Sequence, residues 1–268
     1  MALQRINAPL TVLGRIADLA TVLRWFAPEH DCSWLRAIQA RLRGRVGTAP
    51  QDRKHARLRS AHELLALGLQ LMGGAASATG RSQRRRARLY RDGLMIALLA
   101  TRPLRLANLV QLTLGRELIR RGEGWWIEIP GSATKTGAPL ELPWPEDLVS
   151  ALETYLAIWR PQLAQAERSL GCRALWLSNQ GRGLGDQQVY SKIVAHTRIA
   201  FGRSVNPHLF RDAAATTMAR DRPQQVRLAA PLLGHRSYTT TERHYMHARV
   251  TEAAGAWHDV LTNIGDGK

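Results

Sequence analysis

The chain has 268 residues, of which 45% are hydrophobic, so it is long enough to bury a core in one large or two modest domains. Its 38 Lys and Arg against 21 Asp and Glu give a net charge of +17 and a pI near 11.3, values typical of proteins that bind nucleic acids. Two distant cysteines exclude a disulfide framework and suggest no metal site. The sequence shows neither a membrane-length apolar run nor a signal peptide, so we expect a cytoplasmic protein.

The chain is predicted to begin with a short, basic, helical domain. Apolar residues recur at helical spacing over residues 8–44, which predicts two helices broken at Pro28. A third helix is predicted over about residues 51–72. Residues 73–80 are small and polar without periodicity, so we place a linker and the domain boundary there. The basic residues of this region form either a solvated face or a surface for a polyanion.

Residues 89–114 are predicted to form a pair of buried helices with a break at Pro103. Arg105 stands among the apolar residues of this stretch, and a charge there is costly unless something pairs with it. Five arginines precede the helix pair directly: Arg81, Arg84, Arg85, Arg86 and Arg88. They give the start of this segment a strongly basic character.

Two short strands are predicted at residues 125–130 and 139–143, joined by a turn over 131–137. Lys135 lies in that turn, where a side chain has mobility and reach. A surface lysine on a hairpin is the commonest alternative to a functional role. The later elements carry no chemistry that we can identify: a helix over 146–163, a strand over 174–177 and a helix over 186–199.

The last third of the chain holds the densest group of polar motifs. His208 and Arg211 are spaced i and i+3 on a predicted helix, so their side chains lie on one face. A guanidinium can hold two phosphate oxygens while a neighbouring imidazole donates a third hydrogen bond. The glycine before His235 suits a helix stop, which leaves that histidine at a turn of the chain. With Tyr238 and Tyr245 beyond it, this segment can hold a phosphate and supply a nucleophile.

The ordered combination of His-x-x-Arg, Leu-Gly-His and a later tyrosine resembles the tyrosine recombinase (phage integrase) family. The resemblance runs from about Arg84 to Val250. It implies a mainly α fold with a small antiparallel β-hairpin or sheet. An integrase-like catalytic domain over residues 81–268 would follow a short helical DNA-binding domain, a partial clamp, over residues 1–80.

The resemblance also implies a reaction. The family attacks one DNA phosphate with a tyrosine, so we expect site-specific recombination through a 3′-phosphotyrosyl intermediate, as in integration or excision of a mobile element. Neither a metal nor a nucleotide cofactor is required. The expected partner is double-stranded DNA, bound by a homo-tetramer on paired sites. A DNA-binding relic of the same fold is the alternative, because the region before the catalytic match is short for a complete clamp.

The resemblance assigns catalytic roles to six residues: Arg105, Lys135, His208, Arg211, His235 and Tyr245. The two arginines would neutralise charge on the transition state. The lysine would protonate the leaving 5′ oxygen, the first histidine would relay the tyrosine proton, and the second would hydrogen-bond the phosphate. The arginine cluster at 81–88 would contact DNA phosphates, which position a protein without reading sequence.

Two assignments have rivals. The segment from Thr101 to Arg105 holds one residue more than the family's Thr-Gly-x-Arg, so Arg102 competes for the role of the first arginine. The residues after Arg105 continue the matching helix and favour Arg105. Tyr238 competes as the nucleophile, but the family's interval after His235 favours Tyr245.

Overall fold

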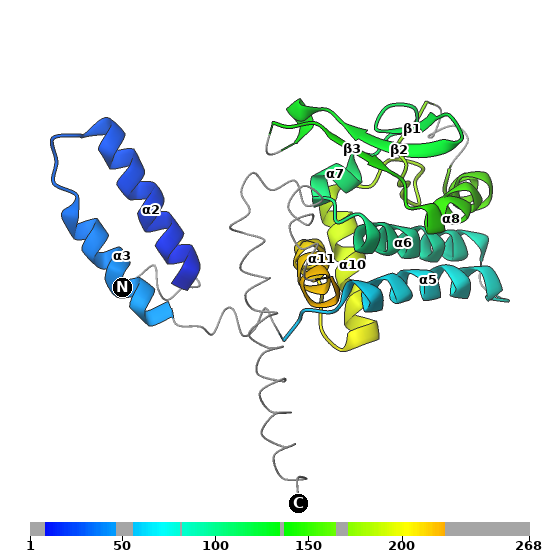
Figure 1. Cartoon of the computed structure of the whole chain (residues 1–268), viewed down its shortest axis with the longest axis horizontal. Helices are drawn as coiled ribbons and strands as arrows, with labels where there is room; N and C mark the ends of the chain where they lie inside the picture. Colours follow the sequence, from blue (N-terminus) through cyan, green and yellow to red (C-terminus); the bar gives the residue numbers. More distant parts are fainter. Residues whose placement is uncertain (1–8, 47–55, 81, 135–136, 165–170, 223–268) are drawn as a thin grey trace, which may run out of the picture. The chain divides into compact units, whose positions relative to one another are not determined.

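The computed structural model describes residues 9–46, 56–80, 82–134, 137–164 and 171–222 (Figure 1). The chain divides into two compact units, Met1–Arg57 and Leu58–Lys268. This division differs from the predicted boundary at residues 73–80, and the reason is the packing of helix α5, which belongs to the second unit. Each unit is described by itself.

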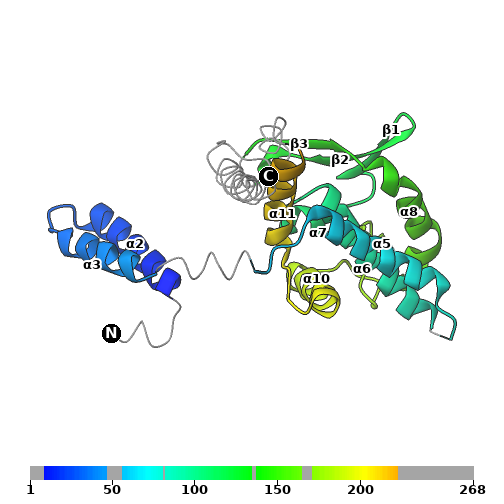
Figure 2. The ribbon, with the colours of Figure 1, turned by 60° about the horizontal axis from the view of Figure 1, so that its bottom comes forward.

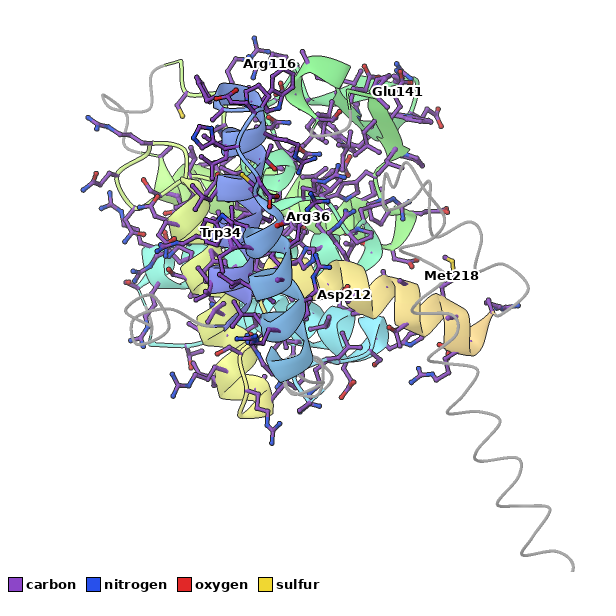
Figure 3. The ribbon with its side chains drawn as sticks, turned by 90° about the vertical axis from the view of Figure 1, so that its left-hand side faces the viewer. Trp34, Arg36, Arg116, Glu141, Asp212 and Met218 are labelled. Carbon is purple, nitrogen blue, oxygen red and sulfur yellow. The ribbon has the colours of Figure 1, made fainter. Side chains whose placement is uncertain are left out.

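The first unit contains two packed helices, α2 over Pro9–Phe26 and α3 over Ser33–Val46 (Figure 2). Asp31 accepts a hydrogen bond from the Ser33 amide at 2.8 Å just where α3 begins. The prediction of two helices broken near Pro28 is confirmed. Their buried side chains are few: Val12, Ala20 and Leu35. Large apolar side chains remain exposed, among them Trp25 on α2 and Trp34 on α3. Trp34 is labelled on its helix in Figure 3.

Helix α5, Ala61–Ser77, begins ten residues later than the predicted third helix and continues into the predicted linker. A capping box sets its start: the Glu63 amide donates to the Ser60 hydroxyl at 3.2 Å, and the Ser60 amide donates to the Glu63 carboxylate at 2.9 Å. Two glycines bring α5 against α6, Gln83–Thr101, because a Cβ at Gly68 would lie 2.7 Å from the Gly93 carbonyl oxygen. The pair is thus one tightly packed hairpin.

Helix α6 forms the centre of the second unit and contacts α5, α9, α10 and α11. Its side chains from Leu94 to Leu99 are fully buried. The shorter helices follow the predicted segments: α7 at Leu106–Val110, then η2, α8, η3 and α9 in succession from Glu146 to Leu163, α10 at Asp186–Phe201 and α11 at Pro207–Asp221. No helix in these described ranges is long and apolar enough to cross a membrane.

A three-stranded antiparallel sheet lies beside α6 in Figure 1, in the order β1-β2-β3. Its strands are β1 at Leu118–Arg121, β2 at Gly124–Ile129 and β3 at Leu140–Pro143. Strands β2 and β3 confirm the predicted hairpin, whereas β1 was missed. The predicted strand at 174–177 is wrong: this segment forms only isolated bridges, Thr113 with Ala174 and Leu177 with Gly183. The mainly α fold with a small antiparallel sheet is confirmed.

Candidate active site

Helix α11 carries two of the predicted catalytic residues one turn apart. Asn206 caps this helix by accepting a hydrogen bond from the Leu209 amide at 3.1 Å, and Pro207 occupies the first helical position. His208 is exposed, whereas only 8% of Arg211 is exposed. The start of α11 therefore presents an imidazole at the surface and holds a guanidinium within the fold.

Arg211 and Arg105 are brought close together by the segment between α6 and α7. The Arg211 Nη1 group donates to the Pro103 carbonyl at 2.6 Å, which fastens α11 to this segment. Arg105 follows two residues later, at the N-cap position of α7. Burial and the positive charge of Arg105 lower the pKa of Arg211 to about 10, against the opposing effect of Asp212. Two of the six predicted catalytic residues thus lie within electrostatic reach of each other.

The lowered pKa of Arg211 reflects its burial and the like charge of Arg105. The protonated Arg211 side chain is less stable here than in water, because it is desolvated and faces the charge of Arg105. An anion bound at the pair would stabilise the protonated form and raise the pKa again. By linkage, the same interaction favours binding of the anion.

Arg102, the rival of Arg105, is engaged elsewhere. Its Nε group donates to the Pro143 carbonyl at 3.0 Å and its Nη1 group to the Thr101 carbonyl at 3.2 Å. Burial lowers its pKa. The arginine whose charge acts on Arg211 is Arg105. The two arginines thus differ in their surroundings: Arg102 contacts backbone carbonyls, and Arg105 acts on the charge of Arg211.

Several predicted residues lie outside the described part of the chain. They are Lys135, His235 and Tyr245 of the catalytic set, the rival Tyr238, and Arg81 of the arginine cluster. Their roles remain predictions from the sequence.

The described arginines of the cluster at the start of α6 differ in their surroundings. Arg84 and Arg85 are exposed in the first turn, and Arg88 is half-buried. The side chain of Arg86 donates to the last carbonyls of α5 at 2.8 and 2.7 Å, and its guanidinium lies 5.1 Å from the ring centre of Trp159. Arg86 therefore joins three helical segments, a structural role that the sequence analysis did not foresee.

A second buried charge cluster lies further along α6. Arg91 is fully buried and donates to one Asp92 oxygen at 2.9 and 2.7 Å and to the Leu177 carbonyl. The other Asp92 oxygen lies 3.1 Å from His196 Nε2. Burial alone would raise the pKa of Asp92, but the hydrogen bond with His196 and the charge of Arg91 lower it. This cluster joins α6 to α10 and to the segment before it.

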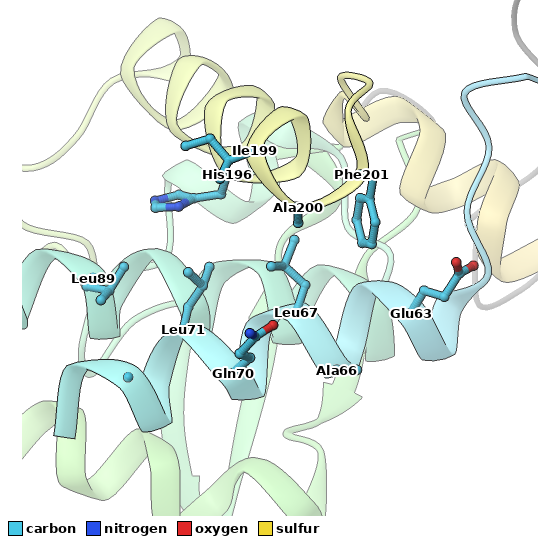
Figure 4. Close-up of a pocket in the computed structure, with 11 residues that line it drawn as sticks. Glu63, Ala66, Leu67, Gln70, Leu71, Leu89, His196, Ile199, Ala200 and Phe201 are labelled. Carbon is cyan, nitrogen blue, oxygen red and sulfur yellow. The ribbon is translucent and has the colours of Figure 1, made fainter. Parts of the chain in front are cut away.

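A hollow of about 580 Å³ lies between α5 and α10 (Figure 4). It is lined mainly by apolar side chains such as Leu67, Leu71 and Phe201. Its two ionisable side chains already have partners, Glu63 in the capping box of α5 and His196 at Asp92. None of the described catalytic candidates, Arg105, His208 and Arg211, is among the residues that line this hollow, and we assign it no part in the chemistry.

The family model described as the phage integrase family matches residues 78–252, which is more than half of the chain. The chain belongs to the phage integrase family. The match includes all six residues to which the resemblance assigned catalytic roles, and it excludes almost all of the first 80 residues.

Curated relatives of this phage integrase family member are named as tyrosine recombinases. XerD of Pseudomonas aeruginosa is 29% identical over 171 residues, which cover 63% of this chain and 54% of the relative. XerC of Pseudomonas syringae pv. tomato is 29% identical over 153 residues, covering 57% and 47%. XerD of Mycobacterium tuberculosis is 34% identical over 109 residues, covering 40% and 34%. The chain therefore spans about half the length of the relatives it matches.

Two solved structures share the fold. The XerH site-specific recombinase bound to a palindromic difH substrate, in a post-cleavage complex, aligns with a TM-score of 0.53 at 21% identity. The alignment covers 73% of this chain and 52% of XerH. The pre-cleavage complex of XerH with difH aligns with a TM-score of 0.51 at 22% identity, covering 75% and 52%. At this identity the likeness establishes the fold.

The sequence analysis missed Arg91 and Asp92, and it did not foresee that Arg102 contacts the sheet. A signal was present for the first two, because adjacent opposite charges interrupt a stretch that is otherwise apolar from Leu89 onward. A buried ion pair is the simplest arrangement for such charges. Nothing comparable in the sequence identifies Pro143 as the partner of Arg102.

Proposed function

We propose that the chain is a tyrosine-type site-specific DNA recombinase that cuts and rejoins strands through a 3′-phosphotyrosyl intermediate. The observation that carries this proposal is the approach of Arg105 to Arg211 in a chain of the phage integrase family. A phosphodiester is an anion, and it gains negative charge as the phosphorus becomes pentacoordinate. A pair of fixed guanidinium groups therefore stabilises the transition state more than the ground state.

The remaining roles follow from the chemistry of the step. The Tyr245 oxygen forms a bond to phosphorus while the bond from phosphorus to the 5′ oxygen breaks. A tyrosine hydroxyl with a pKa of about 10 needs a group to receive its proton, a role that we assign to His208. The leaving 5′ oxygen needs a proton, which we assign to Lys135. His235 donates a hydrogen bond to the phosphate. Reversal of the step with another 5′ hydroxyl rejoins the strands.

Double-stranded DNA is the proposed partner. The net charge of +17 and the exposed Arg84 and Arg85 at the start of α6 support this. Each phosphate contact contributes about −0.9 to the slope of log affinity against log salt concentration. We further propose a homo-tetramer on paired sites that integrates or excises a mobile element. The XerH recombinase, which shares the fold, was solved bound to its difH substrate, and this supports DNA as the partner.

A suicide substrate tests the proposal. Duplexes from the DNA that flanks the coding region, each with a nick beside the candidate cleavage position, would be incubated with the full chain. We expect a covalent protein–DNA product that Tyr245→Phe abolishes and Tyr238→Phe retains. The reverse pattern would assign the nucleophile to Tyr238. DNA binding without any covalent product would instead support the DNA-binding relic.

A further inference from the structure

Arg102 joins the end of helix α6 to the sheet. It follows the last residue of α6, and its own amide donates to the Leu98 carbonyl at 2.7 Å. Its half-buried side chain donates to the Pro143 carbonyl at 3.0 Å and to the Thr101 carbonyl at 3.2 Å. One guanidinium therefore binds the backbone of two elements that lie about 40 residues apart in the sequence.

Pro143 ends β3, the strand that follows the turn between β2 and β3. The described flanks of this turn are closed by their own hydrogen bonds: Thr134 donates its hydroxyl to the Ala138 carbonyl at 2.7 Å, and the Gly137 amide donates to the Thr134 carbonyl at 3.2 Å. β3 pairs with β2 through Trp126 opposite Pro143. Since β3 is an edge strand of the described sheet, the Arg102 side chain adds a contact to this edge.

The segment that begins with Arg102 also holds the arginine pair. The next residue, Pro103, accepts the hydrogen bond from Arg211, and Arg105 follows. Residues 102–105 thus make three contacts: Arg102 contacts the hairpin, Pro103 contacts α11, and Arg105 places a charge beside Arg211. The position of the hairpin and the position of the anion-binding pair are set by the same piece of backbone.

We propose that Arg102 is a positioning residue that holds strand β3 in register with Arg105 and Arg211, and that the action of Lys135, which the sequence places between β2 and β3, depends on this contact. The inference rests on the proposed function, since it assumes that Lys135 protonates the leaving oxygen. The chain connects Lys135 to the contact of Arg102, because Lys135 follows Thr134 directly and the chain then continues through β3 to Pro143. Small displacements of a catalytic group reduce rates strongly, by about 10²-fold for 1 Å.

The test uses two versions of the suicide substrate. In one, the scissile phosphate carries the natural 5′ oxygen; in the other, a 5′ bridging sulfur replaces it. A thiol ionises near pH 8.5, so the sulfur leaves as a thiolate and needs no proton from Lys135. Arg102→Met should cleave the oxygen substrate about 10 to 100 times more slowly than the wild-type protein. It should cleave the sulfur substrate at nearly the wild-type rate.

Companion variants identify the group through which Arg102 acts. Lys135→Ala should show the same rescue by sulfur, and the double variant should be no slower on oxygen than the slower single variant. Arg102→Lys, which keeps one donor, should be intermediate. Arg211→Met should be slow on both substrates. Arg160→Met is the matched control, because Arg160 also donates to backbone carbonyls, those of Cys172 and Ala174, but makes no contact with the hairpin.

The outcomes separate the inference from the proposed function. Equal slowing of Arg102→Met on both substrates, or no slowing on oxygen, would overturn the positioning role while the function stands. A Lys135→Ala variant that sulfur does not rescue would overturn the assignment of the lysine and the positioning role together. Thermal unfolding and DNA affinity of Arg102→Met, measured beside those of Arg160→Met, exclude a general loss of structure as the cause.

Discussion

Arg91 and Arg211 are two buried arginines of the same unit, and their neighbours differ in sign. Arg91 lies against the Asp92 carboxylate, which it contacts with two nitrogens. Arg211 lies near another arginine, and the charge of Arg105 outweighs that of Asp212 in its effect on the pKa of Arg211. A buried guanidinium beside a carboxylate is satisfied within the fold. Arg211 donates to the Pro103 carbonyl and also faces the positive charge of Arg105.

The proposed function therefore assigns Arg91 to the stability of the second unit and Arg211 to DNA cleavage. The Arg91 cluster connects α6 with α10, so its loss should affect folding. If the proposed function holds, changes at Arg105 and Arg211 should affect DNA cleavage more than folding, because both guanidinium groups would act on the phosphate in the transition state. The free energy of unfolding and the cleavage rate, measured on matched variants of the two arginines, therefore test whether their roles differ.

The largest effect is expected for Arg91→Met. The change leaves Asp92 buried without its closest positive charge, and breaking a buried ion pair costs about 3–5 kcal/mol. Urea unfolding should show this loss in the free energy of unfolding. The double variant Arg91→Met with Asp92→Leu should be more stable than the single variant, because it removes both charges. A single variant as stable as the wild-type protein would contradict the structural role.

Arg211→Met should reduce DNA cleavage more than it reduces stability. We expect strand cleavage to fall about 10² to 10³-fold, as when one oriented transition-state donor is removed. The free energy of unfolding should change less than in Arg91→Met, because the loss of the contacts of Arg211, among them the hydrogen bond to Pro103, is partly offset by the removal of a desolvated charge. Both quantities come from suicide-substrate kinetics and urea unfolding. Destabilisation as large as that of Arg91→Met would remove the distinction between the two arginines.

The smallest expected effect is on how the free energy of unfolding depends on pH. The pKa of Asp92 lies below its ordinary value of 3.8 in the folded chain. The ionised carboxylate therefore contributes stability above pH 4 or so, and this contribution is lost as the pH falls through the lowered pKa. Asp92→Asn should lower stability at neutral pH and should flatten its decline between about pH 5 and pH 2. Urea unfolding of both proteins across this range measures the difference, and parallel curves would show that Asp92 does not contribute.

The helices that periodicity predicted are those whose signals are local. The segments of α2, α3, α6, α10 and α11 each show an apolar pattern with a cap or a break, and the structure confirms them. The start of α5 was misplaced although its signal, Ser60 with Glu63 three residues later, was present in the sequence. Strand β1 was missed because its four residues, two of them arginines, carry no alternation long enough to identify a strand.

The charge of the chain, most of its helices, the β2–β3 hairpin and the resemblance to the phage integrase family could be predicted from the amino-acid sequence, because they depend on composition, local periodicity and ordered motifs. The partners of each arginine became known from the fold. Arg211 meets Pro103 across 108 positions of the chain, Arg102 meets Pro143 across 41, and Arg86 turns back to the end of α5. All arginines carry the same charge and donors in a sequence. In the fold, an arginine faces a carbonyl oxygen, a carboxylate, another positive charge or solvent, and these neighbours determine what it can contribute.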